Sequence, residues 1–580
     1  MDGVKRKLSF DDLSEEKIKK FRNKFDQSIT CFEDLSNELL CVIFDYFYGH
    51  ELCKIFSNLN FRFEQLLHSS FVLFKTRCYL FENDEVMNMF KQLMFPHRHQ
   101  IFSMNVNFIF QNNYFFSSFL FDSSFDRLES IFLKDIQSDT LIPVLSNLSS
   151  LPHLFSLTIE TSNVKEKISD IYRLTFVLPQ LKYYRLSFSD KPHSIILPIA
   201  MNNQFSPLEY LVIDHYCSLN ELVILISYTT QLRHLTLHKT KTNDLNSTIL
   251  SSIILDNLES ICLNLRKTKF NELETFITKI IPNLKTLSII ESDDIAFLDA
   301  YRWEQLILNY FPKLENFYLL YNDQVNNKEE YPTYIRGMNQ FSSSFWIERQ
   351  WLFEVEVTDI YNEYTIRPYS ERWYDDIKHD IVNCSVEHST FTNLTIEYIP
   401  NYIFEGVMFK AIERVLTITR IYHLEIHQRK ISIPVLIQII NLLPDIITLK
   451  IYSLSTDETE ELNVKELLIL CSMKETSKIS KVYLEEIVDI QQLDFIFTLC
   501  PYMEYFKVNR INIMDAQSFL CTILKKINRN NYHSLRSLCF DVPTTCDQIV
   551  KNIEEIITCE KLLFHTKVQC ILNTVYLQWK

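Results

Sequence analysis

The stretch LEYLVIDHYCSLNELVILISYTTQLRHLTL, residues 208–237, contains the pattern that decides the fold of this chain. It opens with Leu-x-x-Leu-x-Leu-type spacing at Leu208, and the same spacing returns at Leu232. Side chains two residues apart on a strand point to the same face, so the last two positions of each match predict a buried strand face. The apolar run Leu222–Ile226 between the two matches predicts a helix. The pattern therefore predicts a unit of one strand followed by one helix.

This unit is repeated along the chain. Subtracting successive first positions gives steps of 26, 27, 27, 24, 26, 26 and 30 residues. Unrelated strands of an α/β protein would show no such period. Each unit alone leaves apolar surface exposed, and stacked neighbours cover it. The first positions of the eight matches are Leu128, Leu154, Leu181, Leu208, Leu232, Leu258, Leu284 and Leu314.

The repeat resembles the leucine-rich repeat, whose units of ~20–29 residues each contain a strand and a helix. The resemblance implies a curved α/β solenoid. The chain departs from that family at the turn, because the usual Asn or Cys three residues after the last leucine is present only as Asn322, with Thr240 among the weaker substitutes. A looser series of matches follows. Its first positions are Ile421, Ile446, Ile479, Met503, Leu535 and Leu572.

Glycine, charge and cysteine content exclude several classes of site. The 580 residues include four glycines, too few and too scattered for a Gly-x-Gly-x-x-Gly turn, a phosphate loop or a Gly-x-Ser-x-Gly elbow. The net charge of −15 argues against a dedicated nucleic-acid binder. The fourteen cysteines contain no Cys-x-x-Cys pair, so we expect reduced thiols rather than a zinc site. We expect neither a metal nor a cofactor.

The amino terminus differs in composition from the rest of the chain. Residues 1–29 are expected to form a disordered charged tail, in which basic groups at 5–7 and 17–24 match a bipartite nuclear-import signal. A solvated, partly helical tail is the alternative. The chain shows no signal-peptide core and no apolar run of the ~20 residues that span a bilayer. We therefore expect a cytoplasmic or nuclear protein, or one found in both, with no membrane partner.

Residues 30–75 predict a module of three short helices. Ser36 is placed to cap the first helix, and Gly49 follows it where a left-handed closing residue is wanted. A second predicted helix carries Leu52, Ile55, Phe56 and Leu59, and a third carries Phe63, Leu66 and Leu67. So short a module makes a marginal core, so we expect some of its large apolar side chains to be exposed to a partner. The first helix carries its apolar residues at helical spacing: Leu39, Leu40, Ile43, Phe44 and Phe47.

The module resembles an F-box, whose pattern is Leu-Pro-x-Glu, a first helix with Leu/Ile positions, an Asp/Glu-Leu start to the second helix and Asn/Ser-Arg at the third. The matching residues are Leu35, Glu38, Leu39, Leu40, Ile43, Phe44, Glu51, Leu52, Leu59, Asn60 and Arg62. Ser36 stands where proline is usual and Phe63 where tryptophan is frequent. The resemblance implies docking onto a Skp-family adaptor of a cullin–RING ubiquitin ligase. The adaptor-binding residues it implies are Leu35, Ser36, Leu39, Leu40, Ile43, Phe44, Leu52, Leu59 and Phe63.

The remaining chain is predicted to have four parts. Residues 76–127 form a helical connector, 128–320 a leucine-rich-repeat-like array, 321–420 an irregular tryptophan-rich insertion or lengthened repeats, and 421–580 a second array with the carboxy-terminal end. The third part contains Trp346, Trp351 and Trp373. These residues predict either core packing or a binding surface. The run Leu352–Val357 predicts one strand within this part.

Candidate recognition residues lie beside the middle apolar position of each strand, where side chains point away from the core. Tyrosine and arginine are enriched in protein-binding hot spots. Catalytic and metal constellations are weak: His97–His99 brings no carboxylate or thiol, and the charged cluster at 375–380 favours a solvated helix face. No residue is predicted to be catalytic. The predicted target-binding residues are Tyr183, Arg185, Tyr210, His234 and Tyr318.

Two functions follow from the sequence. The first is a non-catalytic substrate receptor of a Skp–cullin–F-box ubiquitin ligase, which binds the adaptor through residues 35–67 and a protein target through the repeats. The alternative is a leucine-rich-repeat scaffold with no ubiquitin role, in which the first helices cap the array. An enzyme hidden in the tryptophan-rich part is a third, remote alternative.

Overall fold

The chain divides into two compact units. The first comprises Met1–Ile195 and Ser206–Leu208, and the second comprises Ile196–Phe205 and Glu209–Lys580. The boundary falls inside the predicted array 128–320, so that array is not one compact unit. The computed structural model describes residues 32–79, 92–107, 121–161, 167–188, 194–201, 204–241, 253–291, 293–324, 340–358, 361–370, 392–397, 405–455, 462–511, 516–530, 534–541, 550–551, 553–555, 557, 566–571 and 573–579.

The first unit begins with short helices close to the predicted ones, but the second of the three predicted helices ends at Phe56 and does not carry Leu59. They are η1 (Phe32–Asp34), α2 (Asn37–Phe44), α3 (Gly49–Phe56) and α4 (Phe61–Leu67). Ser36 is the N-cap of α2 as predicted, but the prediction for Gly49 is wrong because Gly49 is the first residue of α3. Glycine is needed there for close approach: a Cβ atom would lie 2.5 Å from Met94 Cε and 2.9 Å from Phe74 Cβ.

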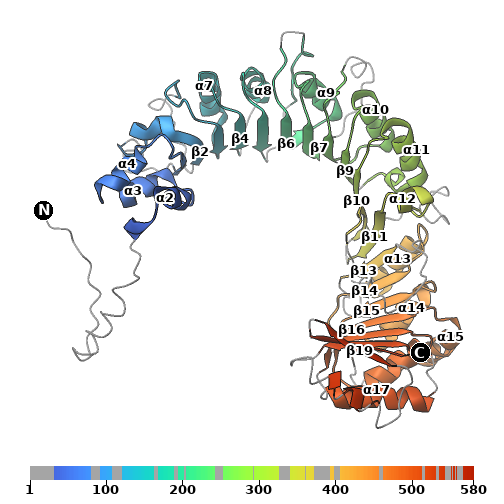
Figure 1. The fold of residues 1–580 in the computed structure, drawn as a ribbon. Coiled ribbons are helices and arrows are strands. Elements are labelled where there is room, and N and C mark those ends of the chain that lie inside the picture. Colours follow the sequence, from blue (N-terminus) through green and yellow to red (C-terminus); the bar gives the residue numbers. More distant parts are fainter. Residues whose placement is uncertain are drawn as a thin grey trace, which may run out of the picture. The chain divides into compact units, whose positions relative to one another are not determined.

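The parallel strands of the first unit start earlier than the sequence repeat. The predicted helical connector at 76–127 instead includes η2 (Phe95–Gln100), most of β1 (Phe74–Tyr79) and all of β2 (Ile101–Asn107). Both strands are parallel, and β2 pairs with β3 (Ser130–Lys134), the strand of the first repeat match. β3 then pairs in parallel with β4 (Ser156–Thr161), and β4 with β5 (Tyr183–Phe188). Helices α7 (Ser138–Leu148) and α8 (Ile168–Phe176) follow β3 and β4 and lie on one face of the strands (Figure 1).

The second unit opens with five parallel strands that carry the repeat matches. They are β6 (Tyr210–Cys217), β7 (His234–Thr240), β8 (Ser260–Asn264), β9 (Thr286–Glu291) and β10 (Asn316–Gln324). The predicted helix at 222–226 is present as α9 (Leu219–Ser227), and α10 (Phe270–Ile280) precedes β9. η5 (Ile295–Leu298) and α11 (Ala300–Tyr310) precede β10, and α9, α10 and α11 cover one face of the strands (Figure 1).

The apolar positions of the repeat form the core under these helices. The pairing places Leu211, Leu235, Ile261, Leu287 and Phe317 side by side across β6–β10, and each is buried. On each strand of the sheet, the residues that alternate with the buried positions lie on the opposite side. We call that side the open face of the strands. Thr240 takes the turn role expected of it, because its hydroxyl donates to the carbonyl of Arg266 in the next unit (3.2 Å). Successive units of the sequence repeat therefore place their apolar side chains at equivalent positions in the core.

The tryptophan-rich part continues the same sheet. Its elements are α12 (Ser344–Glu348), β11 (Trp351–Val357), β12 (Tyr361–Pro368), β13 (Asn393–Ile396) and α13 (Glu405–Leu416). β12 lies between β10 and β11 and is antiparallel to both, so β11 keeps the direction of β10 and pairs in parallel with β13. The predicted strand at 352–357 is confirmed as β11. Trp346 and Trp351 are buried, which confirms core packing for these two, and Trp373 lies outside the described residues.

The last part returns to alternating strands and helices. The elements are β14 (His423–Ile426), α14 (Ile433–Leu442), β15 (Thr448–Ile451), α15 (Val464–Thr476), β16 (Lys481–Ile487), α16 (Ile490–Leu499), β17 (Tyr505–Ile511), α17 (Ala516–Asn530), β18 (Ser537–Asp541), β19 (Lys567–Ile571) and β20 (Thr574–Gln578).

Strands β13–β18 are parallel, as the looser repeat matches predict. The final match differs, because β20 is antiparallel to both β18 and β19. In the part of the chain that the structure describes, eight cysteines are free thiols, as expected, but Cys570 is disulfide-bonded and departs from that expectation. The protein is thus an α/β chain of mostly parallel strands alternating with helices, compatible with a solenoid.

Candidate functional site

Local hydrogen bonds cap helices α2 and α4 and join their starts. The N–H of Leu39 donates to Ser36 Oγ (3.4 Å), and the N–H of Phe63 donates to Asn60 Oδ1 (3.0 Å), so both helices begin at side-chain caps. Arg62 joins the start of α4 to the start of α2: its Nε donates to Asn37 Oδ1 (2.9 Å) and its Nη2 to the carbonyl of Leu35 (2.5 Å). The two chain segments are therefore fixed against each other.

Several residues that the sequence assigns to adaptor docking form the inner core of this module instead. The Phe56 ring contacts the rings of Phe44 and Phe63, with centroids 4.9 and 5.2 Å apart. A side chain that is buried in its own domain cannot contact a partner unless the domain opens. The buried members of the predicted set are core residues of the module: Leu40, Phe44, Leu52 and Phe63.

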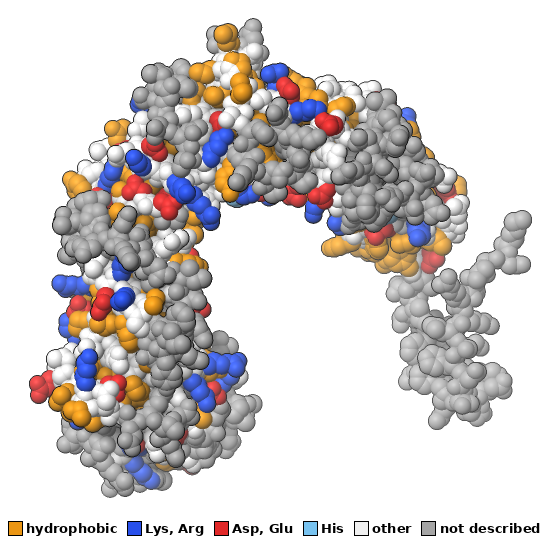
Figure 2. Space-filling model, turned by 180° about the vertical axis from the view of Figure 1, so that it is seen from behind, with side chains coloured by type: hydrophobic (Ala, Val, Ile, Leu, Met, Phe, Trp, Pro, Cys, Tyr) orange, Lys and Arg blue, Asp and Glu red, His pale blue; other side chains and the backbone are white. Residues whose placement is uncertain are grey.

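The outer surface of the module keeps a group of large apolar side chains. On α2, Leu39, Val42 and Tyr46 follow one another at helical spacing or just beyond the helix end and are 53%, 55% and 83% exposed. Figure 2 shows hydrophobic side chains gathered on this part of the molecule. We call the following residues the module patch: Leu39, Val42, Tyr46, Ile55, Leu59 and Phe61, all exposed.

The sequence prediction recovers part of this patch. Leu39 and Leu59 are in both sets, Ser36 is exposed, and Leu35 and Ile43 are half-buried. Val42, Tyr46, Ile55 and Phe61 were missed. For Val42 and Tyr46 the signal was a second apolar stripe opposite Leu40 and Phe44, which a single amphipathic pattern does not reveal. Ile55 lies on α3 and Phe61 begins α4.

The predicted target-binding residues lie on the open face but in different units. Tyr183 and Arg185 are half-buried on β5 of the first unit. Tyr210 and His234 are register partners in the second unit, and their rings stack with centroids 4.4 Å apart and planes 6° apart. Tyr318, on β10, is 41% exposed. The structure therefore brings two of the five predicted residues into contact.

A floor of small side chains separates His234 from Tyr318. The residues of the intervening strands on the open face are Ser260, Cys262, Thr286 and Ser288, and all four are half-buried. Strands are ~4.8 Å apart, so the three steps from β7 to β10 span about 14 Å. Sequence reasoning missed this floor because small residues carry no periodic signal.

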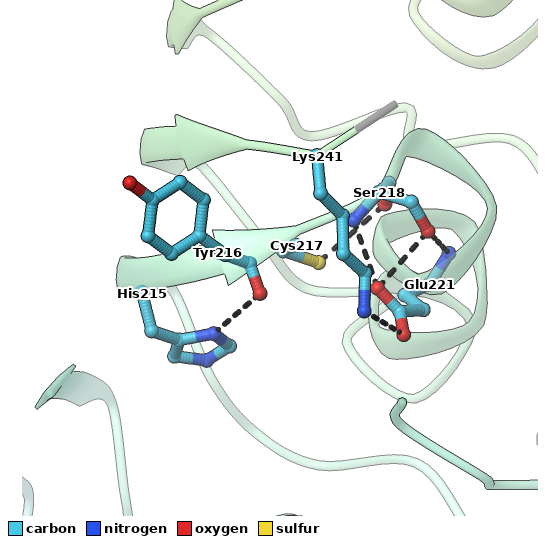
Figure 3. Close-up of polar contacts among 6 residues, drawn as sticks. All are labelled: His215, Tyr216, Cys217, Ser218, Glu221 and Lys241. Atoms are coloured by element: carbon cyan, nitrogen blue, oxygen red, sulfur yellow. Dashed lines mark hydrogen bonds and ion pairs between the residues drawn. The ribbon is translucent and has the colours of Figure 1, made fainter. Parts of the chain in front are cut away.

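A buried polar cluster marks the start of α9 (Figure 3). The N–H of Ser218 donates to Glu221 Oε2 (2.8 Å), and the N–H of Glu221 donates to Ser218 Oγ (3.3 Å). Lys241 Nζ lies 2.7 Å from Glu221 Oε1 and balances the charge of that carboxylate. These contacts cap the helix and attach it to the end of β7.

His215 and Cys217 lie beside this cluster but do not form an activated pair. Burial lowers the pKa of His215 to about 4, and burial raises the pKa of the Cys217 thiol well above its ordinary value. Both groups are therefore neutral near pH 7. His215 Nδ1 lies 3.1 Å from the carbonyl oxygen of Tyr216, and Cys217 Sγ contacts the carbonyl of Ser218 (3.5 Å). Nucleophilic chemistry needs a thiolate, which this environment disfavours.

The weaker candidates from the sequence do not gain support. His97 is buried, where its Nδ1 lies 2.9 Å from Gln100 Oε1, and the cluster at 375–380 lies outside the described residues, as does the tail at 1–29. Within the described ranges, no group of three or more His, Cys, Asp or Glu residues could hold a metal ion. In the same ranges no helix is both long and apolar enough to cross a bilayer.

No family model and no curated protein sequence matches the chain. The fold, the module patch and the open face are therefore the basis for assigning a function.

Proposed function

We propose that the chain is a non-catalytic substrate receptor of a Skp–cullin–F-box ubiquitin ligase. The residues at 35–67 resemble an F-box, and the repeats that follow resemble leucine-rich repeats. In this proposal the module patch docks the Skp-family adaptor, and the open face of the strands holds a protein target.

The observation that carries this proposal is the exposure of the module patch. Six large apolar side chains are exposed on a module whose other large apolar residues, such as Phe44, Phe56 and Phe63, are buried. Large exposed apolar patches mark protein–protein interfaces in soluble proteins. Aromatic members such as Tyr46 and Phe61 are of the type that supplies most of the binding energy at interfaces.

The proposed mechanism is proximity. A target held on the open face is tethered near the ubiquitin-loading enzyme, which raises the effective concentration of its lysines. Positioning the reactants in this way can lower a barrier without any catalytic group on the receptor. The neutral state of Cys217 and His215 agrees with this division of labour.

The test is capture of a purified Skp-family adaptor by the full chain. The variant Leu39→Asp with Val42→Asp places two charges in the module patch and should weaken capture by about a hundredfold, because aspartate must be desolvated at the interface. The matched control is Tyr301→Asp with Leu308→Asp, which changes two exposed apolar residues of α11. Both variants should keep the wild-type circular dichroism spectrum.

Equal adaptor binding by the patch variant and the wild type would refute the proposed docking surface. Failure of the wild-type chain to capture adaptor would refute the proposed class of protein. Ligase activity is a further step and needs a reconstituted ubiquitylation assay with the captured complex.

A second candidate is a repeat scaffold in which the module only caps the sheet. It is favoured by the way the module packs on β1, since Gly49 abuts Phe74 and Gln100 Nε2 donates to the carbonyls of Leu67 (3.0 Å) and Val72 (3.0 Å). Terminal caps of this kind protect repeat arrays. If the module is only a cap, the variant with Leu39→Asp and Val42→Asp should bind every partner of the chain as tightly as the α11 control does.

A further inference from the structure

Four polar side chains form one row across the open face of strands β10, β12, β11 and β13. Asn322 pairs in register with Glu363, Glu363 with Glu356, and Glu356 with Thr395. Each is half-buried and alternates with buried neighbours on its strand, so all four point away from the core. We call them the carboxylate row. Its three strand steps span about 14 Å.

The row is rich in hydrogen-bond acceptors that lack donors. Among the described residues, Asn322 Oδ1 is buried without a hydrogen-bond partner, and Glu356 and Glu363 have neither a hydrogen bond nor an ion pair. Carboxylates beside the row are compensated. Glu354 pairs with Arg367 (2.6 Å), and Glu425, the register partner of Thr395, pairs with Lys450 (2.7 Å). The row thus differs from these two neighbouring carboxylates, each of which has a cationic partner.

Asn393 adds an independent unpartnered acceptor. Its side chain is 7% exposed, and its Oδ1 is buried without a hydrogen-bond partner. Its Nδ2 donates to Thr395 Oγ1 (3.2 Å), so the amide group extends along β13 toward the row. A buried amide oxygen without a donor costs free energy that a bound donor would recover.

The arrangement costs the protein stability. Like charges directly opposite each other on neighbouring strands repel. Burial raises the pKa of Glu356; the negative charges of Glu397 and Glu363 raise it further, and His427 lowers it. Burial also raises the pKa of Glu363. Carboxylates held in so unfavourable an environment are characteristic of binding sites, because a ligand can relieve the cost.

We propose that the carboxylate row binds the arginine side chains of a basic segment of a partner protein. A guanidinium group carries five N–H donors and no acceptor, in a planar fork that matches carboxylates. The row offers acceptors without donors, which is the complementary set. The inference deepens the proposed function by naming the chemistry of the target, and it rests on the open face being the target-binding surface but not on adaptor docking.

The experiment measures binding of labelled peptides to the full chain by fluorescence anisotropy near physiological salt. The probe is a glycine–serine peptide carrying several arginines, with lysine and citrulline versions for comparison. We expect the affinity order arginine, lysine, citrulline, because citrulline keeps the shape but loses the charge. Glu356→Gln with Glu363→Gln should weaken arginine-peptide binding about tenfold or more.

The matched control is Glu348→Gln with Glu413→Gln, two exposed glutamates on α12 and α13. It removes the same net charge from the same unit, so it reports the non-specific attraction of an acidic protein. Equal losses in both variants would refute the proposal. A rise in Tm on addition of Ca²⁺ or Mg²⁺ alone would also refute the proposal, because it would indicate that the row binds a metal ion.

A structural role for the two glutamates is separated by stability. The proposal expects the row variant to melt at the same or a higher temperature than the wild type while losing the peptide. A lower Tm together with lost binding would overturn it, since the glutamates would then be needed for the fold. Adaptor capture is measured on the same proteins, so a failed row and a failed module patch give different patterns.

Discussion

Strands β6–β10 and strands β11–β13 belong to the same unit but differ on both of their faces. On β6–β9 the buried repeat positions Leu211, Leu235, Ile261 and Leu287 are all leucine or isoleucine. Beside β11 the core is a group of aromatic rings in which Trp346 contacts Trp351, Phe317 and Phe341. Along the edge of β6–β9 the charges are paired, as in Arg233 with Glu209 and Lys285 with Glu259, whereas the carboxylate row is unpaired.

The comparison teaches that a regular repeat and a functional surface place opposite demands on a sequence. Regular units need interchangeable side chains so that neighbours stack in one register. The insertion of antiparallel β12 interrupts the regular stacking of units, so residues of other types can occupy both faces of the sheet there. We therefore expect function to concentrate where the repeat is broken, and the following predictions test this difference.

The largest effect is expected in the aromatic core. Trp346→Ala should lower the free energy of unfolding by about 3–5 kcal/mol, because it removes a fully buried indole and leaves a cavity. Trp346→Phe should cost much less, since Trp346 Nε1 is buried without a hydrogen-bond partner and phenylalanine removes that N–H. Urea unfolding followed by circular dichroism measures both. Equal losses for the two variants would contradict the cavity explanation.

The next effect concerns the ion pair that joins α13 to β10. Asp323 is buried, and Arg414 Nη2 donates to its Oδ1 (3.1 Å). Arg414→Gln should cost about 3 kcal/mol of unfolding free energy, because it leaves an uncompensated buried carboxylate. The double variant with Asp323→Asn should recover much of that loss in the same urea titration. A double variant that is less stable than Arg414→Gln alone would show that the pair itself supplies the stability.

The smallest effect is a pH dependence of stability at the carboxylate row. The folded-state pKa of Glu356 and Glu363 is raised, so the folded protein holds these protons more tightly than the unfolded chain. Wild-type stability from these groups is therefore lost as the pH rises through the raised pKa values. Glu356→Gln with Glu363→Gln should raise Tm at pH 7, and the difference should vanish below about pH 4, near the ordinary pKa of glutamate. A difference that grows toward acid pH would contradict the assignment.

Sequence reasoning recovered the elements whose signal is local. The caps at Ser36, the strands with Leu-x-x-Leu-x-Leu spacing and the helix at 222–226 depend on residues a few positions apart. It failed where the signal is not local. β1 and β2 lack the leucine spacing, and they became visible only through their pairing with each other and with β3.

The candidate sites divide in the same way. The sequence located the module, but which of its apolar residues are core and which are exposed depends on how three helices pack, since Leu39 and Leu40 are adjacent and have opposite fates. The pairing of Tyr210 with His234 followed from the repeat, because both occupy the same position in neighbouring units.

The amino-acid sequence alone determined the alternation of strand and helix and the parallel order of most strands, because side-chain periodicity is written in neighbouring residues. Only the tertiary structure decided that Asn322, Glu363 and Glu356 share one row, because β12 is inserted between β10 and β11 against the order of the chain. Such a row depends on register between strands, and register is set by the packing of whole elements rather than by any short stretch of sequence.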